Sequence, residues 1–477
     1  MNSLATFFSR LYRYATVCVV VGSPLFFIPR TSFSPEITYY LTMMLLITIA
    51  LVSYVISALL TKSWHSVSKL EFYSYIAVSI AIIGSVFFAN NQRTALFGDL
   101  FNPQAAVALF TLPVVMYLVR ALPETLRQNL KYILVVILGV SAFVFTATLM
   151  STGGIIDAAK IMFSGFTSSS SFAAYIGIFV IGCLLYVNKV DLAKKWKAFI
   201  VIVAVLFLAW AVSLTAQDNI HPNFGSTLIV GKNVMLKEGI FGIGAGNFNR
   251  AWQMYRPESV IASPQFVYDF NQGSDTMSTL FVNIGIVGLL AFLALVLSVL
   301  YSTYVSYRQV REGKEHFILG LLTLVLLYFA IIAWVLPLSY PMLIVWMVVA
   351  GLGIAKAKLT EYHPSKKLGF VMVPVAVLLL VNIWVNVGKT QAFALFTKAQ
   401  TSTNTKDAEA LLAKAAIIYP FDGFYRAQVE NSIQANSLLI SSSTMEKEVI
   451  KTENLMQASS SVNSGLSAVR ADPSNYH

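Results

Sequence analysis

Two arginines with a tryptophan between them are the side chains of this sequence best suited to bind an anionic substrate. Arg250, Trp252 and Arg256 stand in the run NFNRAWQMYRP, within a polar stretch at residues 215–275. A guanidinium group binds two phosphate oxygens at once, which suits a pyrophosphate group. The same residues would also serve as a membrane-surface anchor, because aromatic rings and long basic side chains favour the interface between lipid and water.

The element that must position these residues is predicted from their spacing. Phe248, Trp252 and Tyr255 are four and three positions apart, which places them on one face of a helix. Aromatic residues in such a pattern favour the membrane–water interface. We therefore expect a short helix that lies on the membrane surface, with this aromatic face at the level of the lipid headgroups.

A second helix is predicted through LIVGKNVMLKE, where it would extend Lys232 and Lys237 as supporting contacts for the same anion. The run IFGIGAGNF follows, with glycine at alternate positions. Such glycines permit unusual backbone angles, so the run is either a turn that packs against the membrane or a cradle of main-chain N–H groups around a phosphate. A dinucleotide-binding fold is excluded, because no strand precedes the glycines.

Two carboxylates, Asp269 and Asp275, stand where the polar stretch re-enters the apolar sequence. Either is a candidate catalytic base that would take a proton from an acceptor hydroxyl group. A carboxylate at this point would equally well cap the long apolar helix that follows. His221 is a lone histidine, and no cluster of His, Cys or carboxylate residues has the spacing of a metal site, so we predict no metal and no cofactor.

The composition predicts an all-α polytopic membrane protein. Of 477 residues, 57% are hydrophobic and 12% are charged, whereas soluble domains carry about 25% charged residues. Runs of about 20 apolar residues predict membrane helices. We expect eleven spans, near residues 11–29, 39–60, 72–89, 103–119, 131–150, 171–187, 198–214, 276–304, 317–335, 341–355 and 368–387.

The basic residues predict how the chain is oriented in the membrane. If the N-terminus is cytoplasmic, the inner loops hold most of the Lys and Arg residues, and the opposite short loops hold only Arg30, Arg93 and Lys160. The stretch 215–275 and the C-terminal tail then face outward. The net charge of +11 follows mostly from this asymmetry, so it does not indicate a nucleic-acid partner. Cys18 and Cys183 lie inside predicted spans and imply no disulfide framework.

Two domains are predicted: a polytopic transmembrane domain at residues 1–387 and an extracytoplasmic helical tail at residues 388–477. In the tail, residues 405–419 place small and apolar side chains at helical spacing, and Pro420 then ends that helix. GFYRAQVENSIQANSLL predicts a second helix after it. The pair resembles an incomplete tetratricopeptide array, and a plain helical hairpin is the alternative.

Several runs of the sequence resemble bacterial O-antigen ligases and O-antigen polymerase-like proteins. They are LKEGIFGIGAGNF, MYRP, ALFGDLFNPQ after the third span, and NIGIVGLLAFL with its glycines at Gly285 and Gly288. The resemblance implies an enzyme of the bacterial inner membrane that works without metal at its outer face. It would transfer a glycan from a polyprenyl pyrophosphate donor to a glycan, lipid or protein acceptor. The residues expected at the donor site are Arg250, Arg256, Lys232, Lys237 and Trp252.

One departure from the family's pattern concerns the catalytic base. The family usually carries a histidine shortly before the glycine that opens the pattern of the re-entering span, and Ser274 and Asp275 stand there in this chain. Asp275 or Asp269 would then serve as the base. The alternative functions are a transporter or flippase for a lipid-linked substrate, and a non-catalytic scaffold that presents the helical tail to a protein partner.

Overall fold

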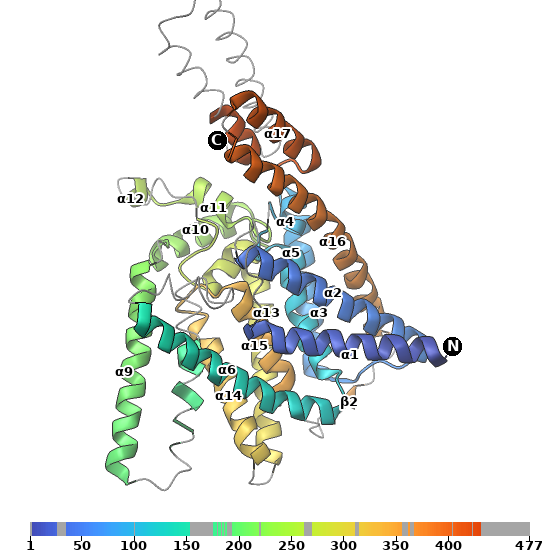
Figure 1. Cartoon of the computed structure of the whole chain (residues 1–477), viewed down its shortest axis with the longest axis vertical. Helices are drawn as coiled ribbons and strands as arrows, with labels where there is room; N and C mark the ends of the chain where they lie inside the picture. Colours follow the sequence, from blue (N-terminus) through green and yellow to red (C-terminus); the bar gives the residue numbers. More distant parts are fainter. Residues whose placement is uncertain are drawn as a thin grey trace, which may run out of the picture. The chain divides into compact units, whose positions relative to one another are not determined.

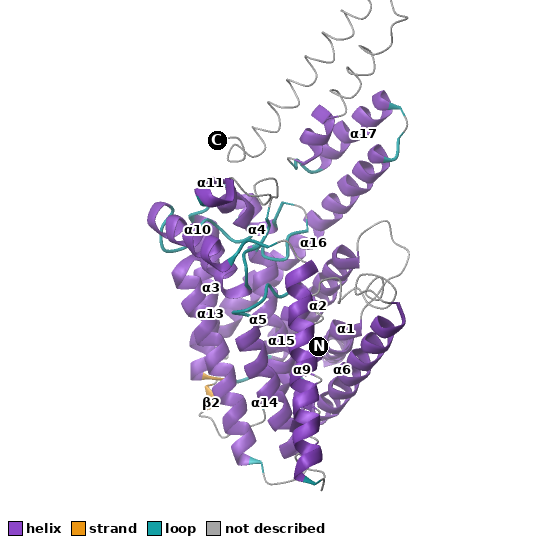
Figure 2. Ribbon diagram, turned by 90° about the vertical axis from the view of Figure 1, so that its left-hand side faces the viewer, coloured by secondary structure: helices purple, strands orange, loops and turns teal. Residues whose placement is uncertain are grey.

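The described residues up to position 152 are mostly helical. The computed structural model describes residues 2–25, 35–99, 101–152, parts of 175–187, 193–218, 221–261, 270–310, 314–354, 361–362, 367–402, 404–421 and 423–430. The helices up to residue 152 are α1 (Asn2–Leu25), α2 (Pro35–Thr61), α3 (Lys69–Phe87), α4 (Gln92–Phe97), α5 (Ala106–Arg120) and α6 (Glu124–Thr152). Figures 1 and 2 show them.

The second half continues in the same way. Its helices are α9 (Lys194–Asp218), α10 (Phe224–Lys237), α11 (Phe248–Tyr255), α12 (Glu258–Ile261), α13 (Thr276–Gln309), α14 (Lys314–Ile332), α15 (Tyr340–Gly353), α16 (Lys367–Gln400) and α17 (Thr405–Ile418). Strands β1 (Val67–Ser68) and β2 (Glu361–Tyr362) pair antiparallel, and this is the one sheet within the described ranges.

The prediction of an all-α membrane protein is confirmed at the level of its helices. Among the described residues, six helices are long and apolar enough to cross a membrane: α1, α2, α3, α13, α14 and α16. The pair α5 and α6 would add a seventh as one span bent by 117°. Helix α15 has 14 residues, about 21 Å, and is buried along its whole length. The predicted number of eleven spans therefore stays a prediction.

The chain divides into two units at a different place from the predicted boundary after residue 387. The first unit comprises residues 1–98 and 103–380, and the second comprises residues 99–102 and 381–477. Helix α16 runs without interruption past residue 387 to Gln400, so no break in secondary structure marks the predicted boundary.

In the second unit, α17 confirms the helix expected at residues 405–419, with Asn404 as its N-cap. Its small residues Ala408 and Ala415 are buried, and they share clusters with Ala399 and Ala392 of α16. Residues 423–430 are helical, as expected after Pro420. Residues 431–477 lie outside the described residues, so the tetratricopeptide array remains a prediction.

In the first unit, α13 packs along α3, and α15 packs along α5. Helix α13 is broken at Gly285, whose φ of 69° lies in the left-handed region that glycine tolerates. The run of glycines at residues 239–247, called here the glycine segment, lies against this break. Gly242, Gly244 and Gly246 of the segment also have positive φ.

The glycine segment supplies hydrogen-bond partners for the backbone that the break leaves free. Ile243 and Gly244 donate their N–H groups to the carbonyl oxygens of Val282 and Asn283, at 3.1 and 3.0 Å. A buried backbone carbonyl without a partner would cost free energy comparable to a lost hydrogen bond. The glycine segment and the break therefore form one structural element.

We predict that alanine at Gly285 destabilises the protein, because a Cβ atom there would lie 2.0 Å from the carbonyl oxygen of Ile240. Overpacking and an unfavourable φ each cost about 1–3 kcal/mol. The melting temperature of the purified full-length protein measures this. Gly139→Ala is the control, since a Cβ there meets nothing within 4 Å. Equal melting temperatures for Gly285→Ala and the wild type would contradict the close packing.

Candidate functional site

The described residues 221–261 and 270–275 of the polar stretch form a small body with α10, the glycine segment and α11, directly before α13. It is called here the outer-loop body, after the side of the membrane that the sequence predicts for it. Figure 2 shows α4, α10 and α11 near one end of the helices, with β2 near the other end. The body has its own apolar core, which includes Val234, Ile243, Phe248, Trp252 and Phe270.

The predicted aromatic face of α11 lies inside this body. Helix α11 forms as expected, but Phe248 and Trp252 are 0% exposed and Tyr255 is 8% exposed. The ring of Trp252 packs edge-on against Phe270, with centroids 5.1 Å apart. The expectation that this face lies among lipid headgroups is therefore wrong. Trp252 supports the body from within, and in this structure it offers no surface to a substrate.

The exposed apolar face that suits a membrane surface lies on α10 and not on α11. Its buried side carries small residues such as Ser226 and Thr227, whereas Leu228, Ile229 and Leu236 are exposed. Apolar side chains on one exposed face are typical of a helix that lies at a lipid surface. Lys232 is exposed on this same side of α10.

Three of the polar groups of the outer-loop body meet at Tyr255. The hydroxyl group of Tyr255 donates a hydrogen bond to Oε1 of Glu238 at 2.7 Å. The Nζ atom of Lys237 lies 5.0 Å from the centre of the tyrosine ring, a cation–π contact. Arg250 is close enough for its charge to act on the same hydroxyl group. Lys237, Glu238, Arg250 and Tyr255 are called the Tyr255 cluster below.

The environment of Tyr255 keeps its hydroxyl group protonated. Burial, followed by the hydrogen bond to Glu238 and the charge of that carboxylate, raises the pKa of Tyr255 to about 12, although Arg250 acts in the opposite direction. Tyr255 is thus a hydrogen-bond donor at neutral pH and holds Glu238 in place.

The structure separates the four basic residues that were expected to act together. Lys237 and Arg250 approach Tyr255, as described above. Lys232 lies five positions before Lys237 on α10, on a different side of the helix. Arg256 is half-buried at the end of α11, where its backbone N–H donates to the carbonyl oxygen of Trp252 at 3.0 Å.

Asp275 caps α13. Its Oδ1 atom accepts the backbone N–H of Ser278 at 2.8 Å, and its Oδ2 atom accepts the hydroxyl groups of Ser274 and Ser278 at 2.7 and 2.6 Å. The residue is 1% exposed. Of the two roles expected for Asp275, capping or acting as a base, the structure supports capping, because its oxygens are buried and occupied. Asp269, the other expected base, lies outside the described residues.

Sequence reasoning missed Glu238, which accepts the hydrogen bond from Tyr255. It stands at the C-cap of α10, between Lys237 and Gly239, and it is half-buried. A carboxylate at the end of a helix has no favourable interaction with the helix dipole. An acidic residue at the C-terminal end of a helix, directly before a glycine, is thus unfavourable by itself. This was the one signal in the sequence that another group holds Glu238 in place.

The glycine segment does not form the alternative phosphate cradle. The N–H groups of Ile243 and Gly244 are bonded to α13, and those of Gly242 and Asn247 are bonded within the segment to Gly239 and Gly244. Residues 242–247 are all buried. The structure supports the other interpretation, in which these glycines form a turn. The turn was expected to pack against the membrane, and in the structure it packs against the broken helix α13.

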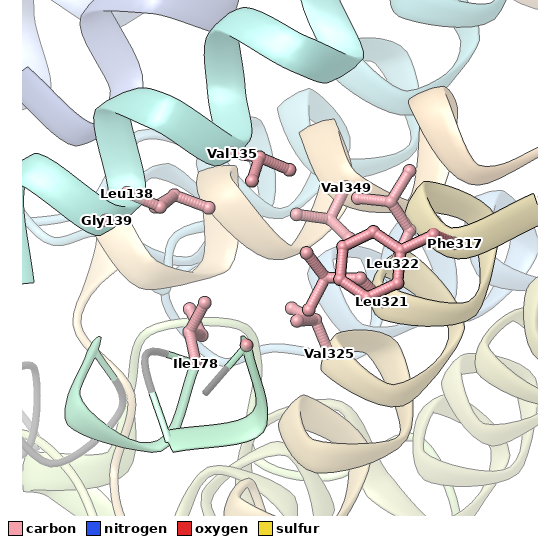
Figure 3. Close-up of a pocket in the computed structure, with 10 residues that line it drawn as sticks. Val135, Leu138, Gly139, Ile178, Phe317, Leu321, Leu322, Val325 and Val349 are labelled. Atoms are coloured by element: carbon pink, nitrogen blue, oxygen red, sulfur yellow. The ribbon is translucent and has the colours of Figure 1, made fainter. Parts of the chain in front are cut away.

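Among the described residues of the first unit, side chains enclose two apolar cavities that bear on a lipid-linked substrate. One, of about 290 Å³, is bordered by α6, α14 and α15 and has an entirely apolar lining that includes Leu138, Phe317 and Leu321 (Figure 3). The other, of about 490 Å³, lies between α3, α4, α5 and α16, with Phe87, Gln92 and Phe110 in its wall. We call the second the α3–α16 groove. The described residues of the two linings include no charged side chain.

The α3–α16 groove leads toward the outer-loop body. Phe88 follows Phe87 at the end of α3, and its ring stacks on Phe241 of the glycine segment with centroids 5.2 Å apart. No group of three or more His, Cys, Asp or Glu residues that could hold a metal ion is found within the described part of the chain.

The capping role of Asp275 predicts that Asp275→Asn preserves the fold, because an amide oxygen can still accept the N–H of Ser278. Asp275→Ala leaves that N–H without its acceptor and removes the carboxylate bonds of two serine hydroxyl groups, which should cost about 1–3 kcal/mol. Thermal unfolding of both variants measures the difference. If Asp275 were a base instead, Asn would abolish activity while leaving the melting temperature unchanged.

The raised pKa of Tyr255 predicts an alkaline instability that Tyr255→Phe removes. The folded protein binds this proton more tightly than the unfolded chain does, so the stabilisation is complete below about pH 10 and is lost as pH rises through about 12. The wild type should therefore lose more stability than Tyr255→Phe over that interval in chemical unfolding at several pH values. Parallel curves for the two proteins would contradict the contact with Glu238.

Comparisons with protein-family models, with curated proteins and with solved structures found no match to this chain.

Proposed function

We propose that the protein is a membrane glycan ligase or polymerase, which transfers a glycan from a polyprenyl pyrophosphate donor to an acceptor hydroxyl at the outer face of the cytoplasmic membrane. The observation that carries the proposal is the Tyr255 cluster, in which two cations and a carboxylate surround one buried tyrosine. The cluster stands on a folded body beside apolar surfaces that can take a lipid chain.

Binding of the donor pyrophosphate falls to Lys237 and Arg250. The two side chains reach Tyr255 from different helices, α10 and α11. Cations held in fixed positions stabilise negative charge as it develops on a leaving pyrophosphate, and they do so without a metal. The core around Trp252 and the hydrogen bonds between the glycine segment and α13 hold α10 and α11 in fixed positions relative to each other.

Glu238 is the proposed general base. Of the described carboxylates at residues 221–261 and 270–275, Asp275 is buried as a cap and Glu258 is exposed. Glu238 would take the proton of the acceptor hydroxyl group while the oxygen of that hydroxyl group forms a bond to the sugar carbon. The bond from that carbon to the pyrophosphate oxygen breaks, and its electron pair leaves with the pyrophosphate.

The hydrocarbon chain of the donor requires an apolar path that ends near these groups. The α3–α16 groove has a volume of about 490 Å³, and its wall at Phe87 adjoins the ring pair of Phe88 and Phe241. The exposed apolar side of α10 would hold the outer-loop body at the membrane surface, with Lys232 reaching toward lipid headgroups.

A transporter is the second candidate, and the break in α13 is the observation that favours it. Transporters often bind their substrate at an unwound helix. Here the freed carbonyl groups of Val282 and Asn283 are already bonded to the glycine segment, and the side chain of Asn283 donates to Gln104 at 2.7 Å. The backbone of the break is thus occupied, which favours transfer over transport. Uptake by vesicles that contain the purified protein would support the transporter.

We predict that Lys237→Ala and Arg250→Ala each lower glycan transfer by about tenfold to a hundredfold, since each removes one charge from the pyrophosphate. Lys232→Ala is the matched control, because it removes the same charge from the same helix and should leave transfer close to that of the wild type. In a deletion strain, the measurement is the amount of polyprenyl pyrophosphate-linked glycan that accumulates with each variant, at equal protein level.

Glu238→Gln tests the proposed base in the same strain. It should stop transfer while the donor stays bound, because the amide keeps the hydrogen bond from Tyr255 but cannot take a proton. Normal transfer by Glu238→Gln would remove Glu238 from the mechanism, and normal transfer by the Lys237→Ala, Arg250→Ala double variant would remove the donor site.

A further inference from the structure

A polar cavity of about 1140 Å³ lies far from the outer-loop body, at the opposite end of α3. It is formed by the N-terminal half of α1, the C-terminal end of α2, and the turn at residues 63–66 that leads to β1. Helix α3 begins at Lys69 beside this turn and contacts the glycine segment at Gly84, near its other end. With 19 residues, α3 is about 28 Å long. The cavity is therefore separate from the Tyr255 cluster.

The charged groups in this cavity are cationic. Arg10 and Arg13 line it from α1, three residues apart and so on one side of the helix. Trp64, His65 and several hydroxyl groups complete the wall, and the described residues of the lining include no Asp or Glu. Glu71 stands outside this lining, and its Oε2 atom accepts hydrogen bonds from the guanidinium of Arg120 and from the N–H of Ser68.

Neither arginine of the cavity has a charged partner among the residues that the structure describes. The Nε atom of Arg13 is buried and donates to no acceptor there, and the Cζ atom of its guanidinium lies 5.9 Å from the centre of the Tyr12 ring. A buried guanidinium donor without an acceptor costs free energy. An anion in the cavity would supply the missing acceptor and neutralise both charges.

The wall opposite the arginines is held in a fixed shape. Lys62 adopts a left-handed φ of 53°, which ends α2 and turns the chain across the cavity. The N–H of His65 donates to the hydroxyl of Tyr54 at 2.9 Å, and that hydroxyl is 2.6 Å from the hydroxyl of Tyr117. The hydroxyl of Tyr117 in turn donates to the carbonyl oxygen of His65 at 3.3 Å. Preorganised walls of this kind reduce the entropy lost on binding.

We propose that this cavity binds a phosphate-bearing anion, held by Arg10 and Arg13 in the manner of guanidinium–phosphate pairs. The phosphate is either the headgroup of an anionic lipid or a soluble phosphate compound. This site is independent of the proposed transfer reaction, because it uses none of its residues and lies at the other end of α3.

The test is the thermal stability of the full-length protein in neutral detergent, with inorganic pyrophosphate or with phosphatidylglycerol as the probe. All variants carry Lys237→Ala and Arg250→Ala, so that the outer-loop body contributes no phosphate binding. A ligand that binds only the folded protein raises its melting temperature, and we expect a rise of a few degrees at saturation. The variant R10Q/R13Q should lose that rise.

The matched control is K69Q/R308Q, which removes the same charge from two exposed side chains outside the cavity. A rise that persists in this control and is lost in R10Q/R13Q supports the site. A rise with phosphatidylglycerol alone identifies a lipid headgroup, and a rise with pyrophosphate identifies a soluble phosphate. No rise with either probe, or equal rises in the two double variants, overturns the proposal.

Two further variants keep the test decisive if R10Q/R13Q does not fold. The single variants R10Q and R13Q each leave one arginine in the cavity wall. Each should give a smaller rise than the parent at the same probe concentration, because one guanidinium–phosphate pair is lost. An undiminished rise in both single variants would place the phosphate elsewhere and overturn the proposal.

Discussion

The break of α13 at Gly285 is the constraint on which the outer-loop body depends. A helix interrupted inside apolar surroundings leaves carbonyl groups that must find partners, since water is not available to bond them. The glycine segment provides those partners, and its own positive φ values let its backbone come close enough. The same contacts set the distance between α10 and α13. Because α10 carries Lys237 and Glu238, the break indirectly positions the Tyr255 cluster.

The N-terminal end of α13 is satisfied in a second way. Asp275 accepts the N–H of Ser278, while Thr276 and Met277 donate their N–H groups to the carbonyls of Leu336 and Ala333 in the turn between α14 and α15. Hydrogen bonds therefore fix both ends of residues 276–284, the part of α13 before the break. One end is bonded to the turn between α14 and α15, and the other is bonded to the glycine segment. This explains why a carboxylate at position 275 is a structural residue, although its place in the sequence also suits a base.

The two proposed sites of the first unit differ in their charged groups. In the outer-loop body the cations stand beside a carboxylate and a tyrosine, which suits acid–base work on a phosphate-bearing substrate. The described residues that line the cavity of Arg10 and Arg13 include no carboxylate, which suits binding without chemistry.

The sequence by itself determined the membrane class, the helices and the glycine turn, because apolar runs, helical periodicity and unusual backbone angles are local properties. It also predicted Arg250 and Lys237 as binding residues, but not that these two meet at Tyr255 while Lys232 points to another side of α10. Only the tertiary structure decided that Trp252 is buried, that Asp275 is a cap and that Glu238 accepts a hydrogen bond. Burial and partner choice depend on contacts between residues far apart in the chain, and periodicity carries no information about them.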